Sequence, residues 1–422
     1  MPTRDLHIDV LILGGGVAGL WTLAHLRKLG YNCLLVEKSA IGSGQTIASQ
    51  GIIHGGVKYA LSGESSDASA SIARMPQIWD DCLAGRGAVD LTACRVLSRE
   101  QFLWTTPGLI SRIAGFGASK LVRAEGEKLD TAARPAAFTD APRGVDVYRV
   151  PERVLDPSSL LTALAGPVNS GGCICKSDEA TIGAHEGSSD GGRTITLSGP
   201  TDTRVTFRAA VLAAGRGNAA LVEAFGCDDM GVVQQLRPLH MVIARNAPAE
   251  IFGHCLGASN LPRLTVTSAR DDATGEWIWY IGGAISEGEG VARSASDQID
   301  ACRAELSQCV GWLDVSRCRF ATLRVDRAEG VAQVRNPPQR PDEPTVARRG
   351  KLIVGWPTKL AFAPAFAAKV ASELAAAGVA PVPGKSQAAC EQSQSVSVAP
   401  LPWAVSTGSG GVGGGREVVS WT

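Results

Sequence analysis

The stretch that decides the fold is residues 8–37, IDVLILGGGVAGLWTLAHLRKLGYNCLLVE. Its first part is an apolar, β-prone run that predicts a buried strand over residues 7–13. After a glycine turn, apolar residues recur with helical spacing and predict a helix over residues 18–29. A second apolar run predicts a strand over residues 33–36, which Glu37 closes. The stretch therefore predicts a strand–helix–strand unit.

The turn inside this unit, residues 14–19 with the sequence GGGVAG, fits the pattern G-x-G-x-x-G. We expect Gly16, which has no side chain, to let a pyrophosphate approach the backbone. The helix N-terminus then offers free N–H groups and a partial positive charge to the phosphates. Gly14 would permit the tight turn, and Gly19 would let helix and strand pack closely. The predicted cofactor-binding residues of the turn are Gly14, Gly16, Val17, Ala18 and Gly19.

The acid at the end of the second strand, Glu37, stands about twenty residues after the turn, as dinucleotide-binding folds require. A carboxylate there can accept hydrogen bonds from the adenosine ribose and disfavours a 2′-phosphate, so NADP is not expected. The motif alone does not separate NAD from FAD. The alternative is a glycine-rich turn without a ligand.

Composition excludes several other classes of protein. The chain has 422 residues, is 45% hydrophobic and 19% charged, and carries no net formal charge, which indicates a globular protein and no nucleic-acid partner. No apolar run reaches the ~18 residues of a membrane span, and no apolar signal segment precedes the first strand, so we expect a cytoplasmic protein. The eleven cysteines are scattered without metal-binding spacing, and no metal site is expected.

Three later segments contain small residues where a cofactor can approach. They are GSGQTIASQGIIHGG at residues 42–56, VLAAGR at residues 211–216, and GWPTKLAFAP at residues 355–364. The first is too long and too rich in glycine for an ordinary connection, which indicates a functional loop. The second and third each follow an apolar run that predicts a strand.

In order and spacing, these segments and the N-terminal turn resemble the D-amino-acid oxidase–like superfamily of FAD-dependent oxidoreductases. This superfamily includes glycine and sarcosine oxidases, glycerol-3-phosphate dehydrogenase and L-2-hydroxyglutarate dehydrogenase. The resemblance departs in the last segment, where Trp356, Pro357 and Lys359 stand in place of glycines. It implies FAD as cofactor, with further contacts from Glu37, Lys38, Ser43, Thr46, Gln50, Gly51, Ile53, Ala214, Gly215, Gly355, Thr358, Lys359 and Leu360.

The same resemblance points to side chains for the chemistry. His54 lies in the loop that the family places beside the flavin ring, and histidine titrates near neutral pH, so it is the candidate base. Arg324 matches a position where the family carries an arginine for the substrate anion. Lys58 and Lys359 are candidates for contact with the same anion or with the flavin. The alternatives are a structural histidine, a structural ion pair and solvated lysines. His240 and His254 are expected to be packed core residues.

The function implied is oxidation at the CH–OH or CH–NH carbon of a small anionic substrate, with a 2-hydroxy acid favoured over an amino acid because of the histidine-containing loop. The acceptor would be oxygen or a quinone. The alternatives are an amino-acid or amine oxidase, a glycerol-3-phosphate-type dehydrogenase, and a flavin-binding subunit without a substrate of its own.

The predicted fold class is α/β, with a Rossmann-like FAD-binding domain interleaved with a β-rich α+β substrate domain. Residues 1–85, 150–225 and 345–386 would form the first domain, residues 86–149 and 226–344 the second, and residues 387–422 a flexible tail. Strands are predicted over residues 194–197, 204–208, 210–214, 235–245, 264–268, 277–281, 320–325 and 352–354, and helices over residues 66–83, 107–117, 157–165, 295–312 and 364–377.

Overall fold

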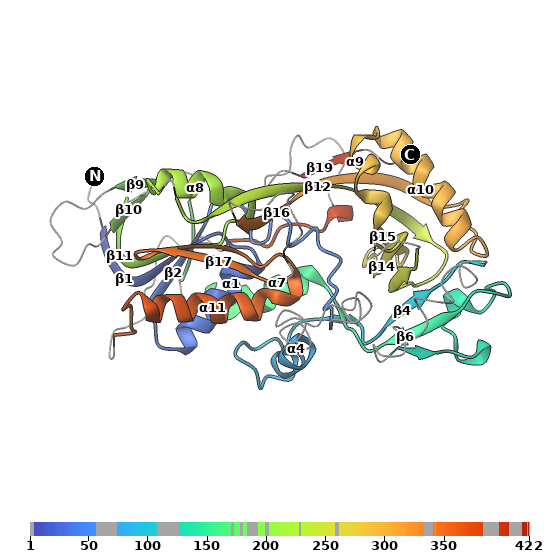
Figure 1. Ribbon diagram of the computed structural model, residues 1–422, viewed down its shortest axis with the longest axis horizontal. Helices are drawn as coiled ribbons and strands as arrows, with labels where there is room; N and C mark the ends of the chain where they lie inside the picture. The colour runs from blue at the N-terminus through green and yellow to red at the C-terminus, as the bar shows by residue number, and fades with distance from the viewer. Residues whose placement is uncertain are drawn as a thin grey trace.

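Figure 1 shows the computed structural model of the chain, an elongated molecule with one sheet at each end. The structure describes residues 4–55, 74–107, 126–169, 173–177, 180–183, 193–198, 202–227, 229–257, 261–332, 341, 343–382, 396–404, 416–419 and 421.

The first sheet has eight strands and contains the N-terminal strand–helix–strand unit. Its main path runs β17–β18–β11–β1–β2–β8, from which β10 and β9 branch at β11. The central pairs are parallel, so the carboxyl ends of β1, β11 and β18 meet at one edge. The strands are β1 (Arg4–Leu13), β2 (Cys33–Glu37), β8 (Ile174–Lys176), β9 (Ala180–Gly183), β10 (Arg193–Leu197), β11 (Thr203–Leu212), β17 (Thr345–Arg349) and β18 (Leu352–Trp356).

Helices cover both faces of this sheet. On one face lie α1 (Val17–Lys28), α7 (Pro157–Asn169) and α11 (Ala363–Ala376), with α4 (Met75–Leu83) beside them, and on the other lies α8 (Asn218–Ala224) (Figure 1). Residues of β1 alternate between the two cores: Val10 and Ile12 are buried against α1, and Leu11 and Leu13 on the opposite face. Burial on both faces explains the uninterrupted apolar run of this strand.

The second sheet has nine strands in the order β19–β16–β12–β15–β14–β13–β4–β6–β5. Helix α10 (Ala295–Cys309) packs on it through Ile299, Cys302 and Leu306. The strands are β4 (Gln101–Trp104), β5 (Glu127–Lys128), β6 (Val147–Val150), β12 (Val232–Ala247), β13 (Gly253–Cys255), β14 (Leu264–Arg270), β15 (Trp277–Gly282), β16 (Arg319–Ala332) and β19 (Arg416–Val419). A separate pair is formed by β3 (Val96–Ser98) and β7 (Val154–Leu155).

Two long strands join the two ends of the molecule. The antiparallel pairing of β12 with β16 runs from Val232 opposite Ala332 to Arg245 opposite Arg319. In Figure 1 this ribbon extends from the first sheet across to the second. It therefore carries side chains of the second sheet over the carboxyl edge of the first.

The predicted strand–helix–strand unit and the predicted α/β class are confirmed. The eight-stranded sheet takes its strands from residues 4–37, 174–212 and 345–356, which supports the interleaved domain division; we keep that division as a proposal. The two short strands predicted over residues 204–208 and 210–214 are one continuous strand, β11. Residues 66–73 and 108–117, parts of two predicted helices, lie outside the described residues.

The predicted flexible tail differs from the structure in its described segments. The N–H of Ile41 donates to the carbonyl of Ser397, and the N–H of Ala399 donates to the carbonyl of Ile41. Strand β19 pairs with β16 over four residues, Arg416 to Val419. These short pairing segments flank a glycine-rich run in the sequence. The composition of the whole stretch therefore gave no sign of them.

Candidate functional site

The glycine turn lies at the carboxyl end of β1, against the loop that follows β11. The backbone at Gly14 has a φ of 114°, and a Cβ there would lie 2.6 Å from Cα of Ala214. A Cβ at Gly19 would overlap the carbonyl oxygen of Gly14, so α1 can approach β1 only because this residue has no side chain. The turn therefore needs glycine for backbone contact on both sides.

The first turn of α1 fits a diphosphate. Its N-cap, Gly16, offers no capping side chain, and no acidic residue stands in the first turn. The N–H of Val17 donates to Oγ1 of Thr46 at 3.2 Å, so the following loop lies next to the helix N-terminus. An anion at this position would meet backbone donors and the positive end of the helix dipole.

The acid at the end of β2 has partners inside the protein. Oε2 of Glu37 accepts the N–H of Gly15 at 2.6 Å, and Oε1 accepts the N–H of Ser39 at 2.9 Å. Oε1 also accepts the hydroxyl of Ser39 at 3.2 Å. Each carboxylate oxygen has two lone pairs, so the acceptor capacity left for a ribose hydroxyl is on Oε2. The ribose contact stays a prediction, as do contacts from Ser43, whose hydroxyl bonds that of Ser39, and from Lys38, which is exposed.

Asn218 ties the other two predicted cofactor segments together. Its Oδ1 accepts the N–H of Ala214 at 2.7 Å, and its Nδ2 donates to the carbonyl of Gly355 at 2.9 Å. The indole N–H of Trp356 donates to the carbonyl of Gly215 at 3.1 Å, and its ring is buried in the core behind the sheet. The large side chain thus packs into the core, which explains how this segment can lack the usual glycines.

The loop of residues 42–55 links the first sheet to the second. Nε2 of Gln50 donates to the carbonyls of Thr265 and Tyr280, at 3.0 and 2.9 Å. The hydroxyl of Tyr280 donates to the carbonyl of Ala48 at 2.8 Å. These bonds hold the loop between the helix N-terminus and the second sheet.

A cavity opens where this loop, the second sheet and the segment after β18 meet. The sequence-predicted residues that line it are Val17, Thr46, Gln50, Gly51, His54, Thr358, Lys359 and Leu360. The remaining predicted cofactor residues do not line this cavity. They belong to the glycine turn, the end of β2, the loop of residues 42–55, the loop after β11 and the end of β18. Lys58 lies outside the described residues.

Two histidines line the cavity, and a buried carboxylate stands behind one of them. Nδ1 of His54 lies 3.4 Å from Oε2 of Glu152, whose side chain is 7% exposed. Glu152 also accepts the backbone N–H of Gly55 at 2.6 Å and Nε2 of Gln101 at 3.2 Å. His254 stacks on His54 with ring centroids 5.9 Å apart, and both line the cavity. A carboxylate at Nδ1 fixes the ring and leaves Nε2 as the basic nitrogen.

The prediction for His254 as a core residue is therefore wrong, because it faces the cavity from β13. The prediction for His240 is confirmed: its side chain is fully buried, and Nδ1 lies 3.0 Å from the carbonyl of Gly290. Glu152 carried no sequence signal, because it follows a short strand within an otherwise unremarkable stretch.

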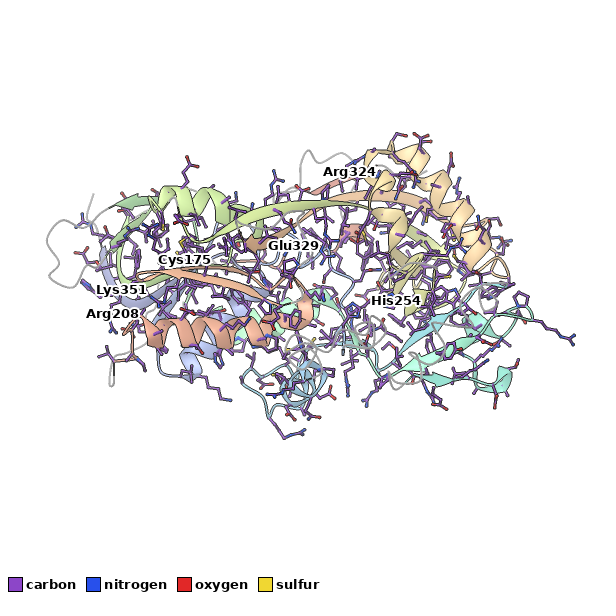
Figure 2. The ribbon with its side chains drawn as sticks, in the orientation of Figure 1. Cys175, Arg208, His254, Arg324, Glu329 and Lys351 are labelled. Carbon is purple, nitrogen blue, oxygen red and sulfur yellow. The ribbon has the colours of Figure 1, made fainter. Side chains whose placement is uncertain are left out.

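The structure does not bring Arg324 to the cavity. Its guanidinium donates to the carbonyls of Val291 and Arg293, both at 2.6 Å, on the segment of α9 (Glu289–Ala292). Figure 2 shows Arg324 beside this helix, away from the centre of the molecule. Side chains alternate along a strand, so Val325 and Arg327 occupy the other face of β16 and line the cavity. Arg327 is the cationic residue that the sequence interpretation missed.

The segment after β18 supplies a second cation and a strained residue. Lys359 lines the cavity, with Nζ 5.4 Å from the centre of the Phe362 ring. Thr358 precedes it with a φ of 61°, a left-handed conformation that a β-branched residue rarely adopts. Nη2 of Arg327 donates to the carbonyl of Thr358 at 3.1 Å. Such strain costs about 1–3 kcal/mol and gathers at functional sites.

The described residues contain neither a metal-binding cluster nor a membrane-spanning helix. Among them, no group of three or more His, Cys, Asp or Glu side chains is arranged to hold a metal ion. Also within that part of the chain, no helix combines the length and the apolar character needed to cross a bilayer.

Taken together, the glycine turn and the neighbouring loops define a protein that binds an ADP-containing cofactor. The profile of the DAO family, described as FAD dependent oxidoreductase, matches residues 9–344. The FAD-dependent oxidoreductase PA4991 of Pseudomonas aeruginosa is 41% identical over 385 residues, which are 90% of this chain and 94% of that protein. Its crystal structure has a TM-score of 0.78 and covers 96% of this chain and 99% of that chain.

More distant solved structures share the fold. Glycine oxidase of Geobacillus kaustophilus is 15% identical with a TM-score of 0.56, covering 90% of this chain and 100% of that chain. L-α-glycerophosphate oxidase of Mycoplasma pneumoniae, solved with FAD bound, is 15% identical with a TM-score of 0.61, covering 87% of this chain and 95% of that chain. The chain belongs to the DAO family of FAD-dependent oxidoreductases. Its cofactor is FAD, as the resemblance implied.

Proposed function

We propose that this enzyme oxidises the CH–OH carbon of a small 2-hydroxy acid. Bound FAD supplies the acceptor for the hydride that leaves this carbon. The remaining tasks fall to the protein: it must hold the carboxylate of the substrate, take the hydroxyl proton and keep the reacting carbon in place.

The observation that carries the proposal is the pairing of His54, which lines the cavity, with the buried carboxylate of Glu152. An alcohol must lose its hydroxyl proton as the hydride leaves, and a histidine whose ring is held by a buried carboxylate suits that task. Nε2 of His54 would accept the proton, and the carboxylate of Glu152 would stabilise the charged ring.

Arg327 and Lys359 are the residues we propose for the substrate anion. Both line the cavity, from the second sheet and from the segment after β18. A guanidinium can bind both oxygens of a carboxylate, and the ammonium adds a point charge. They replace Arg324, which faces away, while a role for Lys58 stays a sequence-based prediction.

The second candidate is an amino-acid or amine oxidase. Solved neighbours of the same fold include glycine oxidase and iminodiacetate oxidase of Chelativorans. A neutral amine needs no base, so His54 would then only shape the cavity. The electron acceptor, oxygen or a quinone, and the cytoplasmic location stay predictions from the sequence.

A substitution of His54 separates these candidates. In a hydroxy-acid enzyme, His54→Ala should lower kcat by about 10² or more, since general-base catalysis contributes at least that factor. An amine oxidase should keep most of its turnover. Turnover of L-lactate and of L-alanine, which differ only in the reacting group, should be compared in the wild type and the variant. Unchanged lactate turnover in His54→Ala would refute the proposed base.

A further inference from the structure

Four alternating charges lie beside the cavity, on the ribbon of β12 and β16 and the segment before α9. We call Glu287, Arg237, Glu329 and Arg327 the charge quartet. Nη1 of Arg237 lies 3.0 Å from Oε2 of Glu287, and Nη2 lies 3.2 Å from Oε1 of Glu329. Nη2 of Arg327 lies 3.7 Å from the same Oε1. The outer members, Glu287 and Arg327, line the cavity, and the inner two hold them.

Glu329 is the buried centre of the quartet. Its side chain is 1% exposed, and Oε2 accepts Nε2 of Gln235 at 3.0 Å. Figure 2 places it near the middle of the molecule, below the long ribbon. A carboxylate buried this deeply is tolerated only with charged or hydrogen-bonding partners, and here it has three.

The strand register explains why an acid is needed at this position. Arg237 and Arg327 stand directly opposite each other on β12 and β16. Like charges that face each other across a strand pair repel, so each guanidinium would turn away in the absence of a shared anion. Glu329, two residues further along β16, lies on the same face as Arg327 and draws both guanidiniums toward one oxygen.

The position of Arg327 also determines a second contact. The nitrogen that faces Glu329, Nη2, donates to the carbonyl of Thr358, the residue with a φ of 61°. Lys359 follows directly in the cavity wall. The buried acid therefore contacts one cationic residue of the cavity, Arg327, which in turn bonds the residue next to the other, Lys359.

We infer that Glu329 is a positioning residue, which sets the guanidinium of Arg327 at the cavity wall and thereby orders the anion-binding end of the site. The inference rests on the proposed role of Arg327 in holding the substrate anion. Glu329 itself is absent from the residues that line the cavity, so it acts through Arg327.

The test uses the FAD-loaded enzyme and oxalate, a small dicarboxylate, as the probe. Oxalate affinity is read from the change in flavin absorbance for the wild type, Glu329→Gln, Arg327→Gln and the double variant. A positioning role predicts that Glu329→Gln raises the Kd by about tenfold, the loss of one charge-assisted contact, while flavin content is kept. In the Arg327→Gln background, Glu329→Gln should add no further rise.

A matched control is Glu305→Gln. It removes the acid of another arginine–glutamate pair, Arg263 with Glu305 at 2.6 Å, in which neither residue lines the cavity. Its oxalate Kd should equal that of the wild type. If Glu329→Gln does not fold, Glu329→Asp keeps the charge and shortens the side chain by one methylene. Glu329→Asp should also raise the oxalate Kd, by a smaller factor than Glu329→Gln.

Different failures have different meanings. If Arg327→Gln leaves the oxalate Kd unchanged, the proposed anion-holding role is wrong and this inference falls with it. If Arg327→Gln raises the Kd but Glu329→Gln and Glu329→Asp do not, only the positioning role is refuted. Equal multiplicative effects of Glu329→Gln in both backgrounds would also refute it, because Glu329 would then act independently of Arg327.

Discussion

The proposed phosphate-binding and substrate-binding ends of the site differ in the kind of group that they present: mainly backbone at the first and mainly side chains at the second. At the proposed phosphate end, the important groups are backbone N–H donors at α1 and glycines that allow close contact with neighbouring backbone. At the proposed substrate end, they are charged or titratable side chains, His54, Arg327 and Lys359, which reach the cavity from three separate segments. The first end is sensitive to any added atom, and the second to the loss of a particular functional group.

This difference has a consequence for variants. A side chain added at the phosphate end should remove the cofactor and every activity with it. A side chain exchanged at the substrate end should leave the bound flavin in place and change turnover or affinity separately. Variants at the two ends should therefore fall into two distinct groups when flavin content and kinetics are measured together.

The largest effect is expected for Gly19→Ala. The new Cβ would overlap the carbonyl of Gly14, and no rotamer can relieve a clash at Cβ. We expect the affinity for FAD to fall by about a hundredfold or more, measured by flavin content and by titration of the apoprotein. Gly166→Ala is the control, because a Cβ at this helical glycine meets no atom within 4 Å. A fully yellow Gly19→Ala protein would contradict this reading of the turn.

A smaller effect is expected for Glu152→Gln. This change removes the charge that supports His54 but keeps the shape of the side chain and its bond to the N–H of Gly55. Turnover should fall by about tenfold or more with unchanged flavin content, because a less basic histidine accepts the proton less readily. The kcat values of the purified holoenzymes provide the check. Equal values would remove Glu152 from the proposed mechanism.

Two arginines on one strand allow a sharper comparison. Arg327→Gln should raise KM for the substrate by about tenfold, because a cavity residue is lost. Arg324→Gln should change KM by less than about twofold, since its guanidinium binds carbonyls on the other face. Both variants differ from the wild type by the same chemical group. A larger KM change in Arg324→Gln would reverse the assignment.

The smallest effect concerns the thiols. Burial raises the pKa of Cys302 to about 12 and that of Cys94 to about 11, so both remain protonated at neutral pH. Their contribution to stability is full below the ordinary thiol pKa of 9.0 and is lost as the pH rises through these values. Mass mapping after iodoacetamide treatment at neutral pH should find both unmodified until denaturant is added. Rapid labelling of the native protein would contradict their burial.

The sequence could predict the strand–helix–strand unit of the proposed phosphate end because the requirements of this unit are local. The strand, the turn, the helix and Glu37 lie within thirty residues, and glycine spacing reports backbone contact directly. The substrate end depends on contacts between distant segments. Glu152 meets His54 across a sequence separation of 98, which no local pattern encodes.

The choice between Arg324 and Arg327 shows a second limit. The two lie three residues apart, so they face opposite sides of β16. The alternation follows from the strand, but the sequence does not tell which set of side chains faces the cavity. A pattern match displaced by an odd number of residues, here three, selects the wrong face. Trp356 shows the same limit, because its size in place of a glycine suggested a departure from the family's loop. Its ring packs into the core, and its indole N–H donates to the carbonyl of Gly215.

The most direct test of the account is anaerobic reduction of the bound flavin by matched pairs of donors. The purified holoenzyme should be mixed without oxygen with L-lactate or L-alanine, and with 2-hydroxyglutarate or glutamate. We predict that a hydroxy acid bleaches the yellow absorbance faster than its amino-acid counterpart, and that His54→Ala abolishes this difference. Bleaching by the amino acids alone, undiminished in His54→Ala, would contradict the proposed hydroxy-acid chemistry.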